Sequence, residues 1–167
     1  MPATRITDGI ELAVIEDMLD RNRAALIETV RGLSEADARR RLVVSLTTPI
    51  SLVKHAAAAE RIWFQRFWAG LGESECDGHA KRDVGTFAVA DDESLADVIA
   101  EFERASQRSR EIAARFDLDD TRDIPREGTI SLRFTLLAMI EEFARHAGHG
   151  DILREQLDHG GHSPASR

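Results

Sequence analysis

Apolar residues recur at three- and four-residue steps through four long stretches of this chain, and this periodicity is the strongest constraint on its fold. Residues at these steps share one face of an α-helix, so each stretch is expected to form an amphipathic helix. The stretches run from about Asp8 to Leu33, from Pro49 to about Leu71, from Asp91 or Asp92 to about Phe116, and from Ile130 or Ser131 to about Asp158. The sequence shows no convincing strand and no internal repeat.

Local signals mark the expected helix ends. Asp8 is a candidate N-cap for the first helix, and Thr47 and Thr48 precede an early proline, Pro49, in the second. Gly160 and Gly161 are a C-cap signal after the fourth helix. Residues 72–90 and 117–128 lack periodicity, so we expect a long connection between the second and third helices and another loop before the fourth.

Four such helices are accommodated most simply by an all-α fold, an antiparallel four-helix bundle. A length of 167 residues suits one domain, because about 100 to 200 residues is the usual domain size. We expect this single domain to span residues 1–160 and residues 161–167 to form a disordered tail.

Charge and composition narrow the functional classes. The formal net charge is −8, with acidic and basic residues interspersed, which argues against nucleic acid or an anionic membrane as a partner. The chain has no apolar run of about 18 residues and no signal-peptide pattern, so a cytoplasmic location is expected. The single cysteine, Cys76, excludes an intramolecular disulfide and lies beside no basic helix start that would activate it. Small molecules or a second copy of the chain are the expected partners.

Three polar residues in the last expected helix can all bind a metal. Glu142, His146 and His149 stand at i, i+4 and i+7, so their side chains project from one narrow stripe. Apolar and small residues lie on the same side of this helix: Leu132, Thr135, Met139 and Leu153. The stripe is therefore expected to point inward, where an unpaired carboxylate is costly to bury.

A divalent metal removes this cost, since it accepts imidazole nitrogen and carboxylate oxygen as ligands. Helical bundles build such sites from two ligands on one helix and another from a facing helix. His55 is the only histidine inside an earlier expected helix, and the small residues of 56–59 leave room beside it. Three protein ligands would leave positions open for water or substrate, and this donor set suits zinc, iron and nickel alike.

Spacing alone leaves alternatives open. Helix geometry permits Glu142 with His146, or His146 with His149, as the ligand pair. Each residue also has a structural interpretation, with His55 as a hydrogen-bonded core residue and Glu142 as a partner for Arg145. The remaining histidines are expected in loops or the tail and exposed to solvent: His79, His159 and His162.

Other polar residues near the expected site have two interpretations each. Arg61, Arg145 and Arg154 could bind anionic groups of a thiol or substrate, but we expect each to be a solvated or ion-paired surface residue. Asn22 interrupts the apolar line of the first helix. It either faces the site or is a buried amide bonded to backbone.

These features together resemble the DinB/YfiT-like superfamily, which includes the N-terminal domain of mycothiol-dependent maleylpyruvate isomerase. The resemblance covers nearly the whole chain: four expected helices, a histidine in the second, and a metal motif in the last. In DinB-like proteins the last helix carries two histidines four residues apart, and the second of them begins the run His, any residue, Gly, Gln. Here residues 146–149 read His, Ala, Gly, His, which puts Glu142 in the first ligand position, as in the isomerase branch.

The resemblance implies His55, Glu142 and His146 as ligands of a divalent metal, with zinc favoured and nickel or iron also suitable. His149 replaces the family's Gln and is expected to be a fourth ligand, a substitute for Glu142, or a neighbouring group. The resemblance also implies a homodimer.

The implied activity is that of a metal-dependent thiol S-transferase or a related detoxification enzyme. Its thiol cosubstrate would be mycothiol, bacillithiol or glutathione, and the metal would lower the thiol pKa. The chain then needs no nucleophile of its own, in agreement with the setting of Cys76. The alternative is a non-catalytic helical bundle that binds a metal or a small molecule, such as a dimeric stress-related protein.

Overall fold

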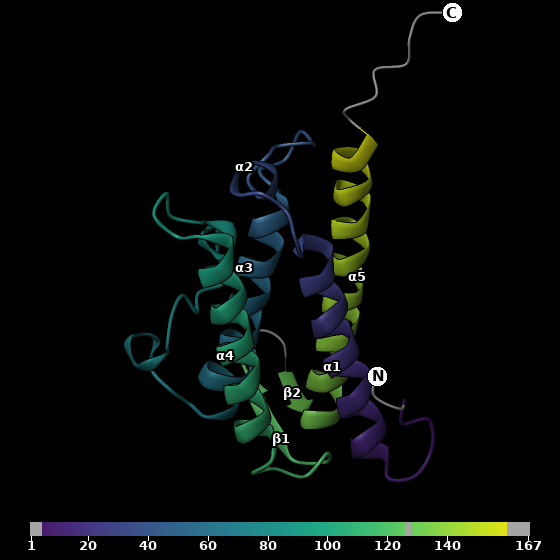
Figure 1. The fold of residues 1–167 in the computed structure, drawn as a ribbon. Coiled ribbons are helices and arrows are strands. Elements are labelled where there is room, and N and C mark those ends of the chain that lie inside the picture. Colours follow the sequence, from purple (N-terminus) through teal and green to yellow (C-terminus); the bar gives the residue numbers. More distant parts are fainter. Residues whose placement is uncertain (1–4, 126–127, 160–167) are drawn as a thin grey trace, which may run out of the picture.

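The computed structural model describes residues 5–125 and 128–159 and shows a mostly helical chain (Figure 1). This confirms the expectation that helices dominate the fold. The elements in chain order are α1 (Glu11–Val30), α2 (Glu35–Ala38), α3 (Pro49–Glu60), the π-helix η1 (Arg61–Trp68), the 3-10 helices η2 (Glu73–Glu75) and η3 (Val84–Phe87), α4 (Leu95–Ala113), the strands β1 (Thr121–Ile124) and β2 (Gly128–Ser131), and α5 (Leu132–His159).

The long helices lie alongside one another in pairs. α1 runs along α5, and α3 runs along α4 (Figure 1). The buried core between them is apolar and draws on all of these helices: it includes Leu19, Leu26, Val53, Phe102 and Phe143. The rings of Phe102 in α4 and Phe143 in α5 meet edge to face, with centroids 5.4 Å apart. This packing leaves α3 and α5 in contact, which brings their side chains face to face.

Capping explains where several helices begin. The predicted start of α3 is confirmed. The Thr48 hydroxyl accepts a hydrogen bond from the backbone N–H of Ser51, the Ser51 hydroxyl accepts one from the backbone N–H of Thr48, and Pro49 occupies the first turn. The predicted Asp8 cap is wrong. α1 follows Ile10, which makes no side-chain cap, and Gly9 with a φ of +96° turns the chain between Asp8 and the helix.

The third and fourth expected helices also begin later than predicted. α4 starts at Leu95 because Ser94 and Asp97 form a reciprocal capping box, which Asp91 and Asp92 do not. It ends at Ala113 instead of Phe116. α5 starts at Leu132, because the two residues before it belong to a strand.

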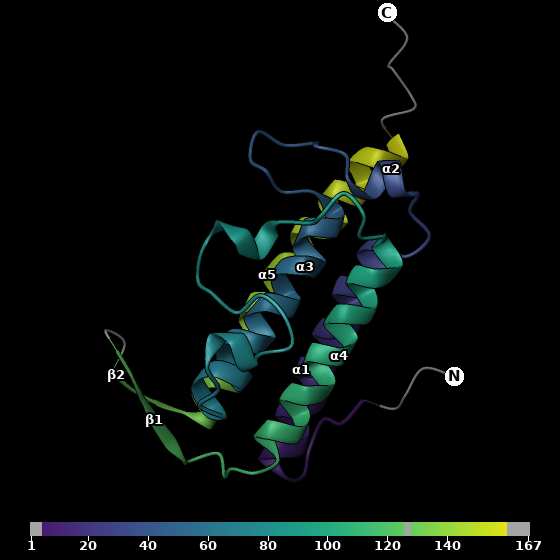
Figure 2. The ribbon, with the colours of Figure 1, turned by 90° about the vertical axis from the view of Figure 1, so that its left-hand side faces the viewer.

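The expectation of no strand is wrong. β1 and β2 pair antiparallel, with Thr121 opposite Ser131 and Ile124 opposite Gly128. Both strands have only four residues, and three of the four in β1 are exposed, so neither shows an alternating apolar pattern long enough to detect. The hairpin lies at the end of the molecule opposite α2 (Figure 2).

The expected second helix consists of an α-helix followed by a π-helix. After α3 the chain continues as a π-helix, η1, which ends at Trp68 instead of Leu71. Glu60 and Arg61 at the junction are almost fully buried, and each is paired with an opposite charge. π-Helical segments are rare and are often found beside functional sites.

The connection after η1 is held against the helices. Arg61 donates from Nε to Asp77 and from Nη1 to Glu101 in α4. Gly78 lies so close to this guanidinium that a Cβ there would come within 2.5 Å of Arg61 Cζ. The predicted long connection also contains two short 3-10 helices, η2 and η3.

No helix in the described part of the chain is long and apolar enough to cross a membrane. The predicted C-cap glycines, Gly160 and Gly161, and the predicted tail at 161–167 lie outside the described residues.

Candidate metal centre

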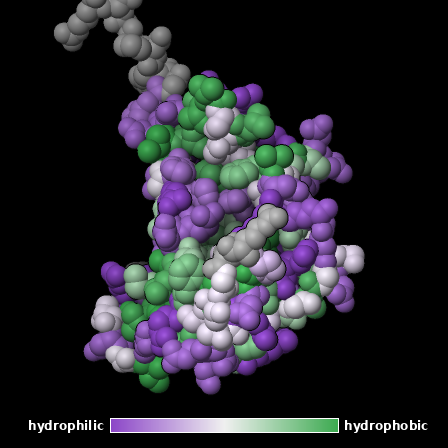
Figure 3. All heavy atoms as spheres, turned by 180° about the vertical axis from the view of Figure 1, so that it is seen from behind, coloured by the Kyte–Doolittle hydropathy of each residue, from purple (hydrophilic) through white to green (hydrophobic). Residues whose placement is uncertain are grey.

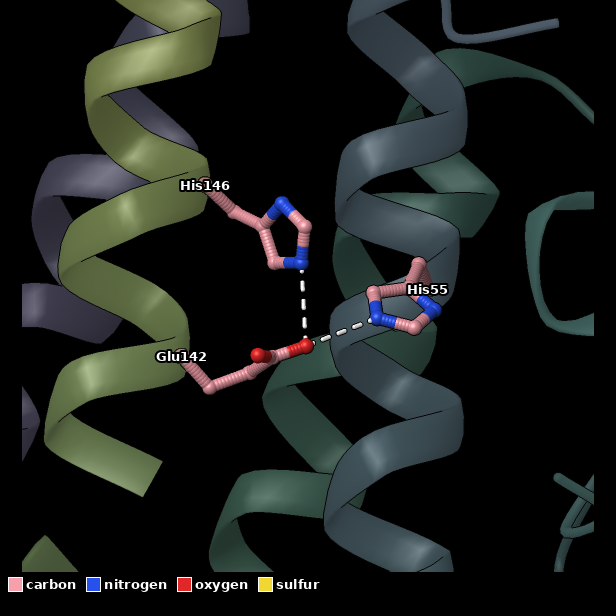
Figure 4. A group of neighbouring side chains, drawn as sticks. All are labelled: His55, Glu142 and His146. Carbon is pink, nitrogen blue, oxygen red and sulfur yellow. Dashed lines mark hydrogen bonds and ion pairs between the residues drawn. The ribbon is translucent and has the colours of Figure 1, made fainter. Parts of the chain in front are cut away.

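Three of the predicted ligands meet between α3 and α5. Glu142 and His146 lie one turn apart on α5 and point toward His55 on α3 (Figure 4). Nε2 of His55 and Nε2 of His146 each lie 2.9 Å from Oε1 of Glu142. One potential ligand atom from each residue lies within 4.8 Å of the other two. This is the only such group of three acidic, histidine or cysteine side chains found in residues 5–125 and 128–159.

Small residues bring His55 close to α5. Ala56, Ala57, Ala58 and Ala59 follow it in α3 and are all buried. Their short side chains allow neighbouring helices to approach α3, and the capping box at Thr48 fixes where that helix starts. His55 therefore occupies a defined position on the face that α3 presents to α5.

Thr86 in η3 orients the His55 ring. Nδ1 of His55 lies 3.0 Å from the Thr86 hydroxyl, and that hydroxyl donates its hydrogen to the carbonyl of Asp83 at 3.0 Å. Because a hydroxyl has only one hydrogen, Thr86 must then accept a hydrogen bond from the Nδ1–H of His55. A neutral His55 consequently has its lone pair on Nε2, directed at Glu142.

Phe87 covers one face of the same ring. Its ring stacks on His55 with centroids 4.1 Å apart and an angle of 7° between the planes. His55 and His146 side chains are 18% and 12% exposed, whereas Glu142 is 31% exposed. The centre is thus covered on the imidazole side and reachable from solvent on the carboxylate side.

Glu142 is ionised in this setting. Hydrogen bonds with His146 and His55 hold the pKa of the Glu142 carboxyl well below its usual range, and they outweigh the opposing effect of burial. A carboxylate has no proton to donate to Nε2 of a neutral His55. The 2.9 Å contact between Nε2 of His55 and Oε1 of Glu142 is a geometry that a shared proton or a metal cation would satisfy.

The residues present fit a divalent metal. Two imidazoles and a carboxylate are ordinary ligands for zinc, and an Nδ1–H donated to an oxygen is the usual way to orient a metal-binding histidine. Nδ1 of His146 is buried and has no hydrogen-bond partner among the described residues. His146 therefore makes its polar contact through Nε2 alone, on the side that faces the centre.

His149 lies outside this group of three. It stands one turn beyond His146 on α5, with its ring centroid 5.6 Å from that of His146. Its side chain lines an adjoining pocket instead, together with Val43 and Ile152.

The other predicted residues have structural partners. Arg61 is buried in ion pairs, Arg145 pairs with Glu141, and Arg154 donates to the carbonyl of Arg31. The Asn22 amide donates to the carbonyl of Met18, which confirms an amide bonded to backbone, but Asn22 is partly exposed instead of buried as that interpretation expected.

The remaining cysteine and histidines also lie outside the centre. Burial raises the pKa of the half-buried Cys76 thiol, in line with its unreactive interpretation. His79 pairs with Asp83, and His159 is the last residue of α5 instead of a loop residue. His162 lies outside the described residues.

Sequence reasoning missed Thr86 and Phe87, because their segment looked like an unstructured connection. A hydroxyl and an aromatic residue side by side between Asp83 and Ala90 were the only available signal. Asp83 caps the turn that carries them by accepting from the backbone of Gly85. The contact with His55, 31 positions earlier in the chain, has no local signature.

A mostly helical chain with three possible metal ligands between two helices agrees with the DinB-like superfamily that the sequence resemblance indicated. A family model described as Mycothiol-S-transferase matches residues 14–159, which is most of the chain. The chain therefore belongs to the mycothiol S-transferase family, a member of that superfamily. A search of curated proteins finds no match.

Proposed function

We propose that this protein is a metal-dependent mycothiol S-transferase that conjugates mycothiol to an electrophile. The observation that carries the proposal is the meeting of His55, Glu142 and His146 between two helices of a chain that belongs to this family. Family membership supports a thiol substrate, and the three side chains support a metal that would activate it.

His55, Glu142 and His146 would hold the metal, with zinc favoured and nickel or iron also compatible with the donors. A bound divalent metal would lower the pKa of the thiol and act as a Lewis acid. Thr86 accepts the Nδ1–H of His55, so the lone pair of the neutral ring lies on Nε2 and is directed at the centre, and Phe87 covers one face of that ring. The more exposed side of Glu142 leaves room for substrates to approach.

The proposed reaction is a substitution at carbon. The thiol loses its proton to solvent, and the thiolate sulfur forms a C–S bond with the electrophilic carbon of the substrate. The bond from that carbon to its leaving group breaks, and the leaving group departs with the bonding electron pair. No side chain of the protein forms a covalent bond, which agrees with the raised pKa of Cys76.

We further infer the arrangement typical of the superfamily. The four long helices would form an antiparallel four-helix bundle in a single domain of residues 1–160, and two copies would associate as a homodimer in the cytoplasm. The paired packing of α1 with α5 and of α3 with α4 supports the bundle.

A non-catalytic binding protein is the second candidate. One observation favours it: Oε1 of Glu142 contacts both imidazoles at 2.9 Å, so protonated histidines would satisfy the carboxylate without a metal. The protein would then bind a small molecule between its helices without activating a thiol.

Metal analysis of the untagged protein, followed by mycothiol conjugation assays against a panel of electrophiles, separates these candidates. We expect about one zinc per chain in the wild type, loss of both metal and conjugation in His55→Ala, and retention of both in the control His79→Ala. We also expect His149→Gln to retain the metal. Full metal content in His55→Ala would remove that residue from the site, and the absence of conjugation, with or without bound metal, would favour the binding protein.

A further inference from the structure

A pocket opens beside the centre, one helical turn further along α5. It has a volume of about 340 Å³, in the lower part of the range of small-molecule sites. One wall comes from the segment that leads into α3 and the other from the C-terminal half of α5. The lining residues are Val43, Ser45, Thr47, His149, Ile152 and Leu153.

The pocket and the centre share α5, and the other wall of the pocket leads directly into α3. His149 lines the pocket, and its ring lies edge-on to that of His146, 5.6 Å away between centroids. On the opposite wall, Thr47 directly precedes the capping residue of α3, the helix that carries His55. A molecule in the pocket would therefore lie next to the group of three.

The lining favours an uncharged, apolar occupant. Half of the lining residues are aliphatic, and none of them is a lysine, arginine, aspartate or glutamate. Val43 and Ile152 are 39% and 57% exposed, and Val44 and Leu46 extend the apolar surface beyond Val43. In Figure 3, hydrophobic residues reach the surface in the upper part of the molecule, the end where Figure 1 shows α2 and the C-terminal half of α5. Covering such surface from water is favourable.

We propose that this pocket binds the hydrocarbon part of an uncharged electrophile and so selects the second substrate. This inference rests on the proposed transferase function. A polar sugar thiol such as mycothiol gains little from an aliphatic wall, whereas an alkyl chain gains from every methylene that it buries. The reacting carbon of the electrophile would then lie at the His149 end, nearest the centre.

N-alkyl-2-chloroacetamides from methyl to hexyl test this, because the reacting group stays constant while the chain grows. In the wild type, kcat/KM with mycothiol should rise by up to about fourfold per methylene until the pocket is filled. Ile152→Asn should flatten this rise. Leu137→Asn, a matched change at a 48% exposed position of the same helix outside the pocket, should preserve it.

A second measurement does not depend on turnover. Binding of the unreactive N-hexylacetamide to the zinc-loaded protein, followed by NMR, should be saturable in the wild type and Leu137→Asn and lost in Ile152→Asn. If no electrophile is conjugated but this pattern of binding holds, the pocket assignment stands and the transferase proposal falls.

Two outcomes would overturn the pocket assignment. One is an equal dependence on chain length in all three proteins, which would leave the transferase proposal intact. The other is a change from dimer to monomer in Ile152→Asn by sedimentation velocity, which would show that a second copy covers this surface.

Discussion

His55 depends on a hydroxyl that reaches it from a different part of the chain. The Thr86 hydroxyl is committed as a donor to Asp83, so it accepts from His55 and thereby sets which ring nitrogen faces Glu142. Thr86 is buried, so no bulk water can take over this role without entering the packed segment. The orientation of the His55 ring at the centre thus depends on the position of Thr86 in the connection between η1 and α4.

Thr86→Val should weaken zinc binding about 10- to 100-fold, the usual cost of losing a hydrogen bond that orients a metal ligand. Valine has nearly the same shape as threonine but cannot accept from Nδ1–H. Competition with a chromophoric chelator measures the dissociation constant, and Thr86→Ser should remain within a few-fold of the wild type. Wild-type affinity in the valine variant would show that Thr86 does not orient His55.

At the scale of elements, glycines set how closely helices pack. A Cβ at Gly150 of α5 would lie 2.8 Å from Cβ of Thr29 in α1, whereas a Cβ at Gly148 would meet nothing within 4 Å. α1 and α5 pack along each other, so the absence of a side chain at position 150 allows this close contact.

The same substitution at these two glycines should have opposite effects. Gly150→Ala should lower the free energy of unfolding by about 1 to 3 kcal/mol, the typical cost of overpacking. Gly148→Ala should raise it by about 0.5 to 1 kcal/mol, because alanine favours a helix over glycine. Urea unfolding followed by circular dichroism measures both. If both variants were equally stabilised, α1 would have to move easily at Thr29 to make room for the added Cβ.

Elements were predictable from sequence to the extent that their signals are local. The start of α3 follows from Thr48 and Pro49, and the stripe of Glu142 and His146 follows from helical spacing. The short hairpin carries too few residues to show a pattern. The contact of Thr86 with His55 joins segments that only the tertiary fold brings together, so no local pattern could reveal it.

Over the whole molecule, the helices are connected by buried ion pairs in addition to apolar packing. Arg23 of α1 donates from Nε and Nη2 to the two carboxylate oxygens of Glu60, at 2.7 and 3.1 Å. Ser106 of α4 donates to the same carboxylate. Glu60 is the last residue of α3, where the π-helix begins, so Arg23, Glu60 and Ser106 together join three helices at this junction. Arg23 also donates to Asp20, which pairs with Arg110 of α4.

The energetic role of this pair can be tested by removing one charge or both. Arg23→Met should lower the free energy of unfolding by about 3 to 5 kcal/mol, since it leaves the fully buried Glu60 carboxylate without its counter-charge. The double variant Arg23→Met/Glu60→Leu should recover much of this loss, because apolar side chains of similar size often replace a buried pair at little cost. Arg21→Met, which removes an exposed pair with Asp17, should change stability by less than about 1 kcal/mol and is the matched control. Equilibrium urea unfolding gives these three values and that of the single variant Glu60→Leu, which completes the double-mutant cycle. If the double variant is as unstable as the sum of the two single changes, the pair is not coupled, and the helices are joined at this point by packing alone.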